Sequence, residues 1–100
     1  MVSKPDISPT RIAEFCRRWH IAELSLFGSV LRDDFSDRSD VDVLVRYETG
    51  TFWDMVQFSA MLDEIESIVG RRVDLVEQHT LGNPRRRDSI LQSRRVLYAA

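Results

Sequence analysis

The sequence predicts an α/β (α+β) fold, in which a single mixed β-sheet of about four strands is flanked by helices. Two observations predict it. Apolar residues recur at helical spacing in two segments, and short apolar runs with alternating faces lie around these segments. A strand, a long helix and another strand also follow one another in the middle of the chain, and this order favours a parallel right-handed crossover. We therefore expect one sheet that helices cover.

The first predicted helix begins at Ser8 and Pro9, because a hydroxyl can cap the helix and proline suits its first position. Its apolar stripe consists of Ile12, Phe15, Cys16 and Trp19. We expect this stripe to pack on the sheet. Cys16 is the only cysteine and lies on the stripe, so we interpret it as a small buried apolar residue and not as a reactive thiol.

A turn at Gly28 and Ser29 follows the first predicted strand, residues 21–27. Gly28 has no Cβ, so the backbone can bend sharply and a phosphate can approach its amide groups. Ser29 adds a hydroxyl donor, and it could start a short helix whose free N–H groups favour an anion. These two residues predict a phosphate-binding turn. Residues 33–39 are polar around Phe35, which is typical of a loop with one anchoring aromatic ring.

Two acids, Asp40 and Asp42, open the second predicted strand. Side chains alternate between the faces of a strand, so both carboxylates point the same way. Their backbone positions lie about 6.6 Å apart, close enough for both side chains to reach one hard cation or a pair of them. Acids are costly to bury without a compensating charge, and a divalent metal ion would supply it.

A long helix is predicted from about Phe52 to Val69, with Gly70 as its C-terminal cap. The stripe expected to face the core consists of Met55, Phe58, Leu62, Ile65 and Val69. Three further apolar residues, Trp53, Met61 and Ile68, fall outside this stripe. They predict a partly exposed apolar surface, and such surfaces often bind partners.

The next predicted strand, Val73–Val76, carries a third acid, Asp74. A parallel crossover would place this strand beside the Asp40 strand and bring Asp74 to the same end of the sheet. A capped helix is expected to start at Asn83 and Pro84, and Arg95–Tyr98 should form the edge strand that ends the sheet.

Three arginines, Arg85 to Arg87, fall in the first turn of this last helix, where the helix dipole prefers acids. We interpret them first as solvated surface, second as a contact to a partner or a triphosphate, and last as a nucleic-acid patch. The run is short and lacks interleaved aromatic residues, so we do not expect direct nucleic-acid binding.

Composition and length limit the class of protein. The chain has 100 residues, which are enough for one core and too few for two, so we expect a single domain over residues 1–100. With 43% hydrophobic residues, 30% charged residues and a net charge of -2, it is neither a disordered tail nor a nucleic-acid coat. We expect a cytoplasmic protein, because the start lacks the apolar core of a secretion signal and no apolar run is long enough to span a bilayer.

The combination of Gly28 and Ser29 with Asp40, Asp42 and Asp74 resembles the signature of the DNA polymerase beta-type nucleotidyltransferase superfamily. The similarity is greatest to its minimal nucleotidyltransferases, also called MntA-like antitoxins, and extends from Leu24 to Tyr98. It includes Arg32 after the Gly-Ser pair and Ser39 before the first acid. One departure is Asp33, where many members carry glycine, and it bears on the loop conformation and on the charge near a bound triphosphate.

This resemblance implies the minimal polymerase-beta-type fold and transfer of AMP from ATP, with Mg²⁺ or possibly Mn²⁺. The acceptor would be a hydroxyl, expected to be a tyrosine, of a HEPN-domain toxin that the chain neutralises as an antitoxin. The catalytic and metal-binding residues would be Asp40, Asp42 and Asp74. The nucleotide-binding residues would be Gly28, Ser29, Arg32 and Ser39.

Two other functions are compatible with parts of the sequence. A binding-only antitoxin would neutralise its partner by covering it, but such a protein gains little from three acids that repel one another without metal. A small-molecule transferase of the aminoglycoside type would need a second domain. The three acids would have purely structural roles if Asp40 capped a loop, Asp42 were a solvated strand residue and Asp74 lay on an exposed sheet face.

Overall fold

The computed structural model describes residues 6–32, 35–36 and 38–100. The elements follow in the order α1 (Pro9–Arg18), β1 (Ile21–Phe27), the 3₁₀ helix η1 (Gly28–Leu31), β2 (Val41–Tyr47), α2 (Met55–Val69), β3 (Val73–Glu77), the 3₁₀ helix η2 (Gln78–Thr80), α3 (Pro84–Ser93) and β4 (Arg95–Ala99). The departure noted at Asp33 lies outside the described residues.

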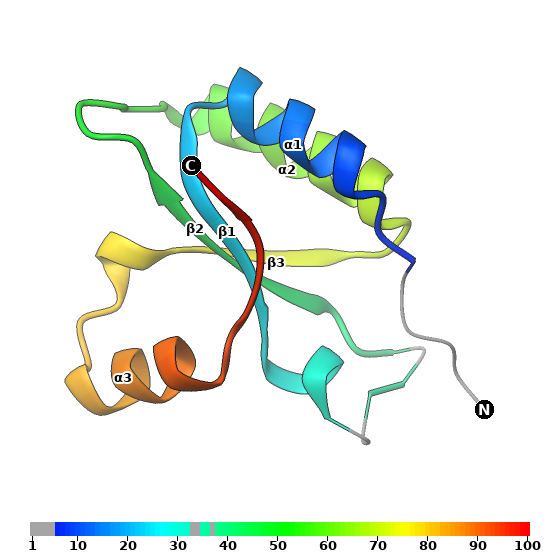
Figure 1. Cartoon of the computed structure of the whole chain (residues 1–100), viewed down its shortest axis with the longest axis vertical. Helices are drawn as coiled ribbons and strands as arrows, with labels where there is room; N and C mark the ends of the chain where they lie inside the picture. The colour runs from blue at the N-terminus through cyan, green and yellow to red at the C-terminus, as the bar shows by residue number, and fades with distance from the viewer. Residues whose placement is uncertain (1–5, 33–34, 37) are drawn as a thin grey trace.

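The four strands form one mixed sheet in the order β3-β2-β1-β4, which Figure 1 shows with its helices. Strand β1 is antiparallel to β2 and to β4, whereas β2 and β3 are parallel and are connected through α2. The predicted mixed sheet, the parallel placement of the third strand and the position of the last strand at an edge are therefore confirmed.

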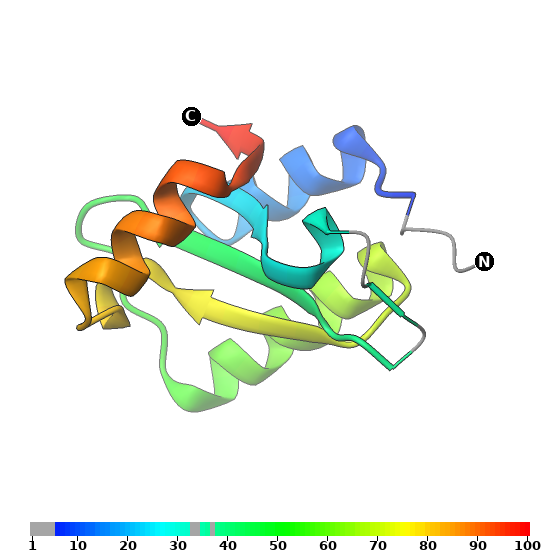
Figure 2. The same ribbon diagram turned by 90° about the horizontal axis from the view of Figure 1, so that it is seen from below.

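Helices cover both faces of the sheet unequally. Helices α1 and α2 lie side by side on one face, and α3 lies on the other (Figures 1 and 2). The larger core cluster fills the space between the sheet and the α1–α2 pair and includes Phe15, Leu24, Val43, Met61 and Ile65. The smaller cluster lies on the α3 face and consists of Phe27, Leu44, Leu81 and Ile90. Figure 2 shows that α3 lies near the ends of β2 and β3, while η1 lies nearer their starts.

The helix boundaries follow their capping residues. Ser8 Oγ accepts a hydrogen bond from the Arg11 N–H at 3.3 Å, and Asn83 Oδ1 accepts one from the Arg85 N–H at 3.0 Å. Both predicted helix starts are confirmed. A reciprocal capping box between Asp54 and Gln57 begins α2. This helix therefore starts at Met55, a few residues after the predicted start near Phe52. It ends at Gly70, which adopts the left-handed conformation expected of a C-terminal cap.

The buried face of α2 differs from the predicted stripe. Met55 was expected in the core but is 88% exposed, whereas Met61 and Ile68, expected to lie outside the stripe, are buried. The buried residues of this helix are Met61, Ile65, Ile68 and Val69. This set also repeats at helical spacing, so periodicity alone cannot distinguish the two stripes, and packing against the sheet and α1 selects one. An exposed apolar surface does occur, but it is formed by Phe52, Met55 and Val56.

The α1 stripe is confirmed, because Ile12, Phe15 and Cys16 are all buried. Burial raises the pKa of the Cys16 thiol to about 12, which agrees with an unreactive apolar role. Trp53 is half-buried before α2, and its indole packs edge-on against Trp19 with ring centroids 5.1 Å apart. Within the described ranges, no helix has the length and apolar character needed to cross a membrane.

Candidate active site

The structure brings two of the predicted acids together through strand pairing. Asp42 is the second residue of β2 and Asp74 the second residue of β3, and the two are register partners in the parallel ladder. They therefore lie at the same end and on the same face of the sheet. Asp40 lies immediately before β2. Asp40 and Asp74 are exposed, whereas Asp42 is half-buried.

The Gly28 turn lies directly against Asp42. Phe27, the last residue of β1, is the register partner of Asp42, so the chain turns into η1 beside this carboxylate. Gly28 has a φ of +74°, and a Cβ at this position would overlap the Asp42 carboxylate. Only glycine accommodates both the left-handed backbone and this close approach. The N–H of Ser29 then donates a hydrogen bond to the Asp42 carboxylate.

Burial and the neighbouring charges both affect the Asp42 carboxyl. Burial raises the pKa of its carboxyl above the usual value, and the negative charge of Asp74 raises it further. The hydrogen bond from Ser29 opposes this rise, Asp40 adds to it, and the Arg32 guanidinium lowers it. Because burial and two neighbouring carboxylates disfavour the ionised form, a cation placed among these groups would favour it.

Arg71 attaches the loop that carries Asp40 to the start of β3. Its guanidinium donates hydrogen bonds of 2.8 Å to the carbonyls of Ser36 and Ser39, and it lies 4.7 Å from the centre of the Phe35 ring. The sequence did not identify Arg71 as a site residue, because its hydrogen-bond partners lie 32 and 35 residues away in the sequence. Its one sequence signal is its position between the predicted end of a helix and a predicted strand.

Ser39 does not join the acids through its hydroxyl. The Ser39 Oγ accepts a hydrogen bond from the Ser36 N–H at 3.1 Å and lies 3.2 Å from the Ser36 Oγ. The serine therefore stabilises its own loop in this structure. Gly28, Ser29, Asp42 and Asp74 form the assembled part of the predicted site, with Arg32 close enough to influence the Asp42 charge.

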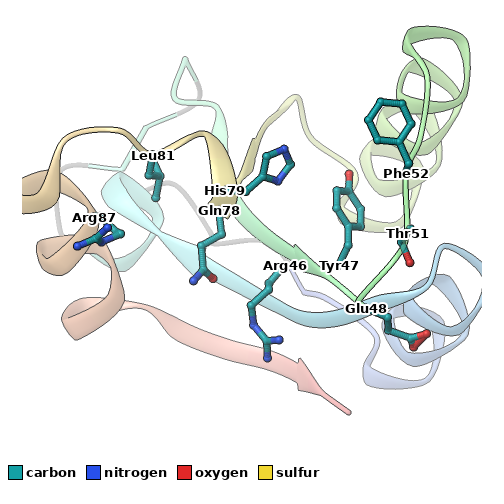
Figure 3. A pocket seen from close by; sticks show the side chains of 9 residues that line it. All are labelled: Arg46, Tyr47, Glu48, Thr51, Phe52, Gln78, His79, Leu81 and Arg87. Carbon is teal, nitrogen blue, oxygen red and sulfur yellow. The ribbon is translucent and has the colours of Figure 1, made fainter.

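Two hollows show where the surface could receive a ligand. One, of about 330 Å³, includes one of the three acids in its lining, which consists of Arg38, Ser39, Asp40, Arg71 and Arg72. The other, of about 630 Å³, lies where β2 and β3 end, and its lining includes Tyr47, Phe52 and His79 (Figure 3). None of the predicted site residues lines the larger hollow, so its size alone does not make it the candidate active site.

The donor chemistry of the acids suits a hard divalent cation, because all three side chains supply carboxylate oxygens. Strand pairing fixes two of them, Asp42 and Asp74, and the loop supplies Asp40. Within the described part of the chain, no three acidic, histidine or cysteine side chains already stand close enough to hold an ion. A bound ion would therefore require the exposed carboxylates of Asp40 and Asp74 to turn toward Asp42.

Comparisons with known proteins identify the family. Residues 10–97 match the nucleotidyltransferase domain family, so the chain belongs to it. The protein adenylyltransferase MntA of Thermococcus cleftensis is 34% identical over 68 residues, which are 68% of this chain and 67% of that protein. A solved structure of a minimal nucleotidyltransferase is 29% identical and has a TM-score of 0.71, covering 87% of this chain and 86% of the other. The resemblance stated from the sequence, and the enzyme class that it implies, are confirmed.

Solved structures of toxin-antitoxin complexes share the fold. One complex with AMP-PNP is 18% identical with a TM-score of 0.71 and covers 94% of this chain and 75% of its match. Another contains a tri-AMPylated HEPN toxin of Shewanella oneidensis with its MNT antitoxin. It is 18% identical with a TM-score of 0.63 and covers 92% of this chain and 70% of its match. The minimal nucleotidyltransferase fold expected from the sequence is thereby confirmed.

Proposed function

We propose that this chain is a metal-dependent protein adenylyltransferase that moves AMP from ATP to a tyrosine hydroxyl of a HEPN-domain toxin and thereby acts as an antitoxin in the cytoplasm. The observation that carries the proposal is the pairing of Asp42 with Asp74 in register, directly against the Gly28 turn. This arrangement combines a metal-binding group with a turn that can approach phosphates, which is what nucleotidyl transfer requires.

Each residue has a proposed role in binding. Asp40, Asp42 and Asp74 would hold Mg²⁺, which when bound neutralises charge on the phosphates and on the attacking and leaving oxygens. Gly28 lets the triphosphate approach the backbone. The Ser29 hydroxyl donates to a phosphate oxygen, since its N–H already donates to Asp42. Arg32 adds positive charge at the same end of the nucleotide.

The transfer is an in-line displacement at the α-phosphorus of ATP. The acceptor oxygen forms a bond to this phosphorus, the bond to the oxygen that bridges to the β-phosphate breaks, and pyrophosphate leaves. The Asp74 carboxylate takes the proton of the acceptor hydroxyl. Asp74 suits this role because it is exposed and lies on β3, an edge strand, where an acceptor on another molecule can approach.

The acceptor and the partner are proposed from the relatives. MntA of T. cleftensis is named a protein adenylyltransferase, and the S. oneidensis complex joins an MNT antitoxin to an AMPylated HEPN toxin. The complex with AMP-PNP supports ATP as the nucleotide donor. Family membership supports transfer chemistry in this chain, and the open edge at β3 is compatible with a protein acceptor.

The test mixes the chain with ATP, Mg²⁺ and the proposed HEPN-domain partner. Intact-mass spectrometry should show AMP added to the partner, and peptide mapping should place it on a tyrosine. Asp74→Asn should lower the rate at least about a hundredfold, because electrostatic and metal contributions are of this size. Asp63→Asn, on the exposed surface of α2, is the matched control and should retain the rate. No AMP on the partner with the wild-type chain would refute the proposed function.

One observation favours a second candidate, a binding-only antitoxin. In the described residues the acids are not already gathered around an ion position. If binding alone neutralises the partner, Asp40→Asn should protect cells as well as the wild-type chain does. Calorimetry provides a second criterion. The carboxylates of an active site repel the triphosphate until a cation bridges them, so an enzyme should bind ATP only with Mg²⁺ or Mn²⁺. Equal ATP affinity in excess chelator, together with full protection by Asp40→Asn, would favour the binding-only function.

A further inference from the structure

The larger hollow lies at the opposite end of the sheet from the acids. Asp42 and Arg46 both belong to β2, and strand alternation places them on the same face. Leu44, which lies between them in the sequence, packs in the cluster on the α3 face. Four residues of strand separate the backbone positions of Asp42 and Arg46 by about 13 Å. The hollow is therefore a neighbour of the candidate active site and not a part of it.

The lining of this hollow combines apolar surface with positive charge. Tyr47, Phe52 and Leu81 supply the apolar surface, and Arg46 and Arg87 supply two guanidinium groups. Figure 3 shows Tyr47 and Phe52 at one end of the hollow and Arg87 at the other. A volume of about 630 Å³ can receive a large apolar side chain together with the charged groups beside it.

The apolar surface continues beyond the hollow. Phe52 is 90% exposed, and Met55 in the first turn of α2 is 88% exposed. Met55 lines a second hollow, of about 210 Å³, together with Glu77, the residue that precedes Gln78 of the larger hollow. Adjacent exposed apolar residues of this kind mark interaction sites. A small ligand in the larger hollow would leave Met55 in solvent, so the arrangement favours a macromolecule.

Three exposed arginines, Arg85 to Arg87, extend the positive charge along the first turn of α3. The N-terminal end of a helix is itself positive, so cations there are disfavoured unless an anion pairs with them. Across the described ranges, no ion pair or side-chain hydrogen bond involves Arg85 or Arg86, and Arg87 approaches Asp88, its neighbour in the sequence, at 3.5 Å. An incoming carboxylate would compensate this charge.

We propose that Arg46, Phe52, Met55 and Arg85 to Arg87 form a docking surface for the protein acceptor, and that the acceptor presents there an acidic segment with a large apolar side chain. This inference rests on the proposed function. The apolar side chain enters the hollow between Tyr47 and Phe52, where burial stabilises the complex. The carboxylates beside it pair with the arginines of α3 and with Arg46.

A protein fits this surface better than the other occupants do. Phosphates would pair with the arginines but would leave Phe52 and Met55 uncovered, and Glu48 and Asp88 beside the arginines would repel them. A standard protein interface covers about 800 Å² on each partner, so one acceptor can span the docking surface and the acids about 13 Å away. The docking surface would then hold the acceptor while its hydroxyl reaches Asp74.

The test measures binding and transfer separately. Calorimetry without ATP gives the affinity for the HEPN-domain partner, and intact-mass spectrometry with ATP and Mg²⁺ gives the transfer rate at several partner concentrations. The variants are Phe52→Ala and the double variant Arg85→Gln, Arg87→Gln. Their controls are Val96→Ala, at an exposed apolar residue of the opposite edge strand, and Arg17→Gln, at an exposed arginine of α1 on the other face of the sheet. Melting temperatures verify that each variant is folded.

We expect Phe52→Ala and the double variant each to weaken partner binding about tenfold or more, the usual size for central interface residues. The partner concentration needed for half-maximal transfer should rise by the same factor. The rate at saturating partner should stay near that of the wild type, because the acids are unchanged. Added salt should weaken wild-type binding more than it weakens binding of the double variant, since the arginines carry the charge that salt screens.

Unchanged affinity in both variants, or equal weakening by the two controls, would overturn the docking surface. Neither result would affect the proposed function as long as AMP is still transferred to the partner. A wild-type chain that binds the partner but transfers no AMP would instead refute the proposed function, and the affinities of the variants would still decide where the partner docks.

Two further measurements address the other occupants. A fluorescently labelled oligoadenylate tests for nucleic acid, and light scattering of the chain alone tests for a second copy. We expect neither weak oligoadenylate binding nor self-association to depend on the docking surface. Tight oligoadenylate binding that the double arginine variant abolishes, with partner binding unchanged, would assign the surface to nucleic acid. A dimer that Phe52→Ala dissociates, with partner binding unchanged, would assign it to a second copy. Either result would overturn the inference.

Discussion

Asp42 and Asp74 are register partners on the parallel strands β2 and β3, with Gly28 packed against the Asp42 carboxylate. The pairing places two negative groups side by side at one end of the sheet, where burial of Asp42 strengthens their repulsion. This repulsion should therefore lower the stability of the protein when no metal ion is bound. Such a cost is typical of sites arranged for a ligand of opposite charge.

Asp42→Asn should raise the melting temperature of the metal-free protein at neutral pH. The amide removes a charge that burial and Asp74 disfavour, and its oxygen can still accept the Ser29 N–H. Thermal denaturation in chelator measures the effect, with Asp63→Asn as a control on exposed α2 surface. A large fall in melting temperature would mean that the Asp42 carboxylate is needed for the fold.

The stability gained by Asp42→Asn should depend on pH. Folding raises the pKa of the Asp42 carboxyl, so the folded protein binds a proton at this carboxyl more tightly than the unfolded chain does. The stability of the wild-type protein therefore falls as the pH rises from the unfolded-state pKa of Asp42 to its folded-state pKa. The advantage of Asp42→Asn should therefore be complete at neutral pH and should disappear once the pH falls below the pKa of the unfolded chain. Denaturant titrations across acidic pH would reveal it. An advantage that persists unchanged at the acid end would contradict the electrostatic explanation.

Gly28→Ala should destabilise the protein more than Gly50→Ala. Both glycines have positive φ, +74° and +85°, so both substitutions introduce left-handed strain of about 1–2 kcal/mol. A Cβ at Gly50 meets nothing within 4 Å, whereas one at Gly28 overlaps the Asp42 carboxylate and adds about 1–3 kcal/mol of overpacking. Urea denaturation measures both. In an Asp42→Ala background the cost of Gly28→Ala should fall to that of Gly50→Ala, and an unchanged cost would exclude the overlap as its cause.

The sequence was sufficient to predict the elements of the site that depend on local pattern. Alternation along a strand placed Asp42 opposite the core-facing valines, and the strand-helix-strand order placed Asp74 beside it. Helix caps at Ser8 and Asn83 were equally local. These features depend only on residues that are close in the sequence or on a general rule of topology, so the sequence is enough to predict them.

Features that depend on tertiary packing were missed. Two overlapping apolar stripes run along α2, and only its contacts with the sheet and α1 bury Met61 while leaving Met55 exposed. The attachment of the loop by Arg71 joins segments 32 to 35 residues apart, and an arginine gives no sequence signal for two carbonyl partners. The engagement of the Ser39 hydroxyl within its loop was likewise not predictable from its position before Asp40.

Ser25→Ala should increase stability or leave it unchanged. The Ser25 side chain is fully buried in β1, and its Oγ has no hydrogen-bond partner among the described residues. Removing an unsatisfied buried hydroxyl should raise the free energy of unfolding by up to about 1 kcal/mol, since the substitution leaves little empty volume. Equilibrium denaturation gives the value. A loss larger than about 1 kcal/mol would show that a water molecule or a side chain satisfies this hydroxyl in solution.

Arg71→Gln should loosen the loop that carries Asp40. The substitution removes two hydrogen bonds to the carbonyls of Ser36 and Ser39 and the contact with the Phe35 ring, which together contribute about 1–3 kcal/mol to holding the loop. Hydrogen exchange should become faster at the Ser39 amide, which donates to the Ser36 carbonyl within this loop. Exchange at the amides in the middle of β1 should remain slow, because that strand is paired on both sides.

The same variant separates positioning from direct ligand contact. If Arg71 acts through the placement of Asp40, Arg71→Gln should raise the Mg²⁺ concentration needed for ATP binding while leaving the affinity at saturating Mg²⁺ nearly as in the wild type. Arg71→Lys should not restore the wild-type Mg²⁺ requirement, because a single ammonium cannot reproduce the planar group that reaches two carbonyls and an aromatic face. Calorimetric titrations at several Mg²⁺ concentrations measure this. An affinity loss that excess Mg²⁺ does not correct would place Arg71 on the nucleotide itself and contradict the positioning role.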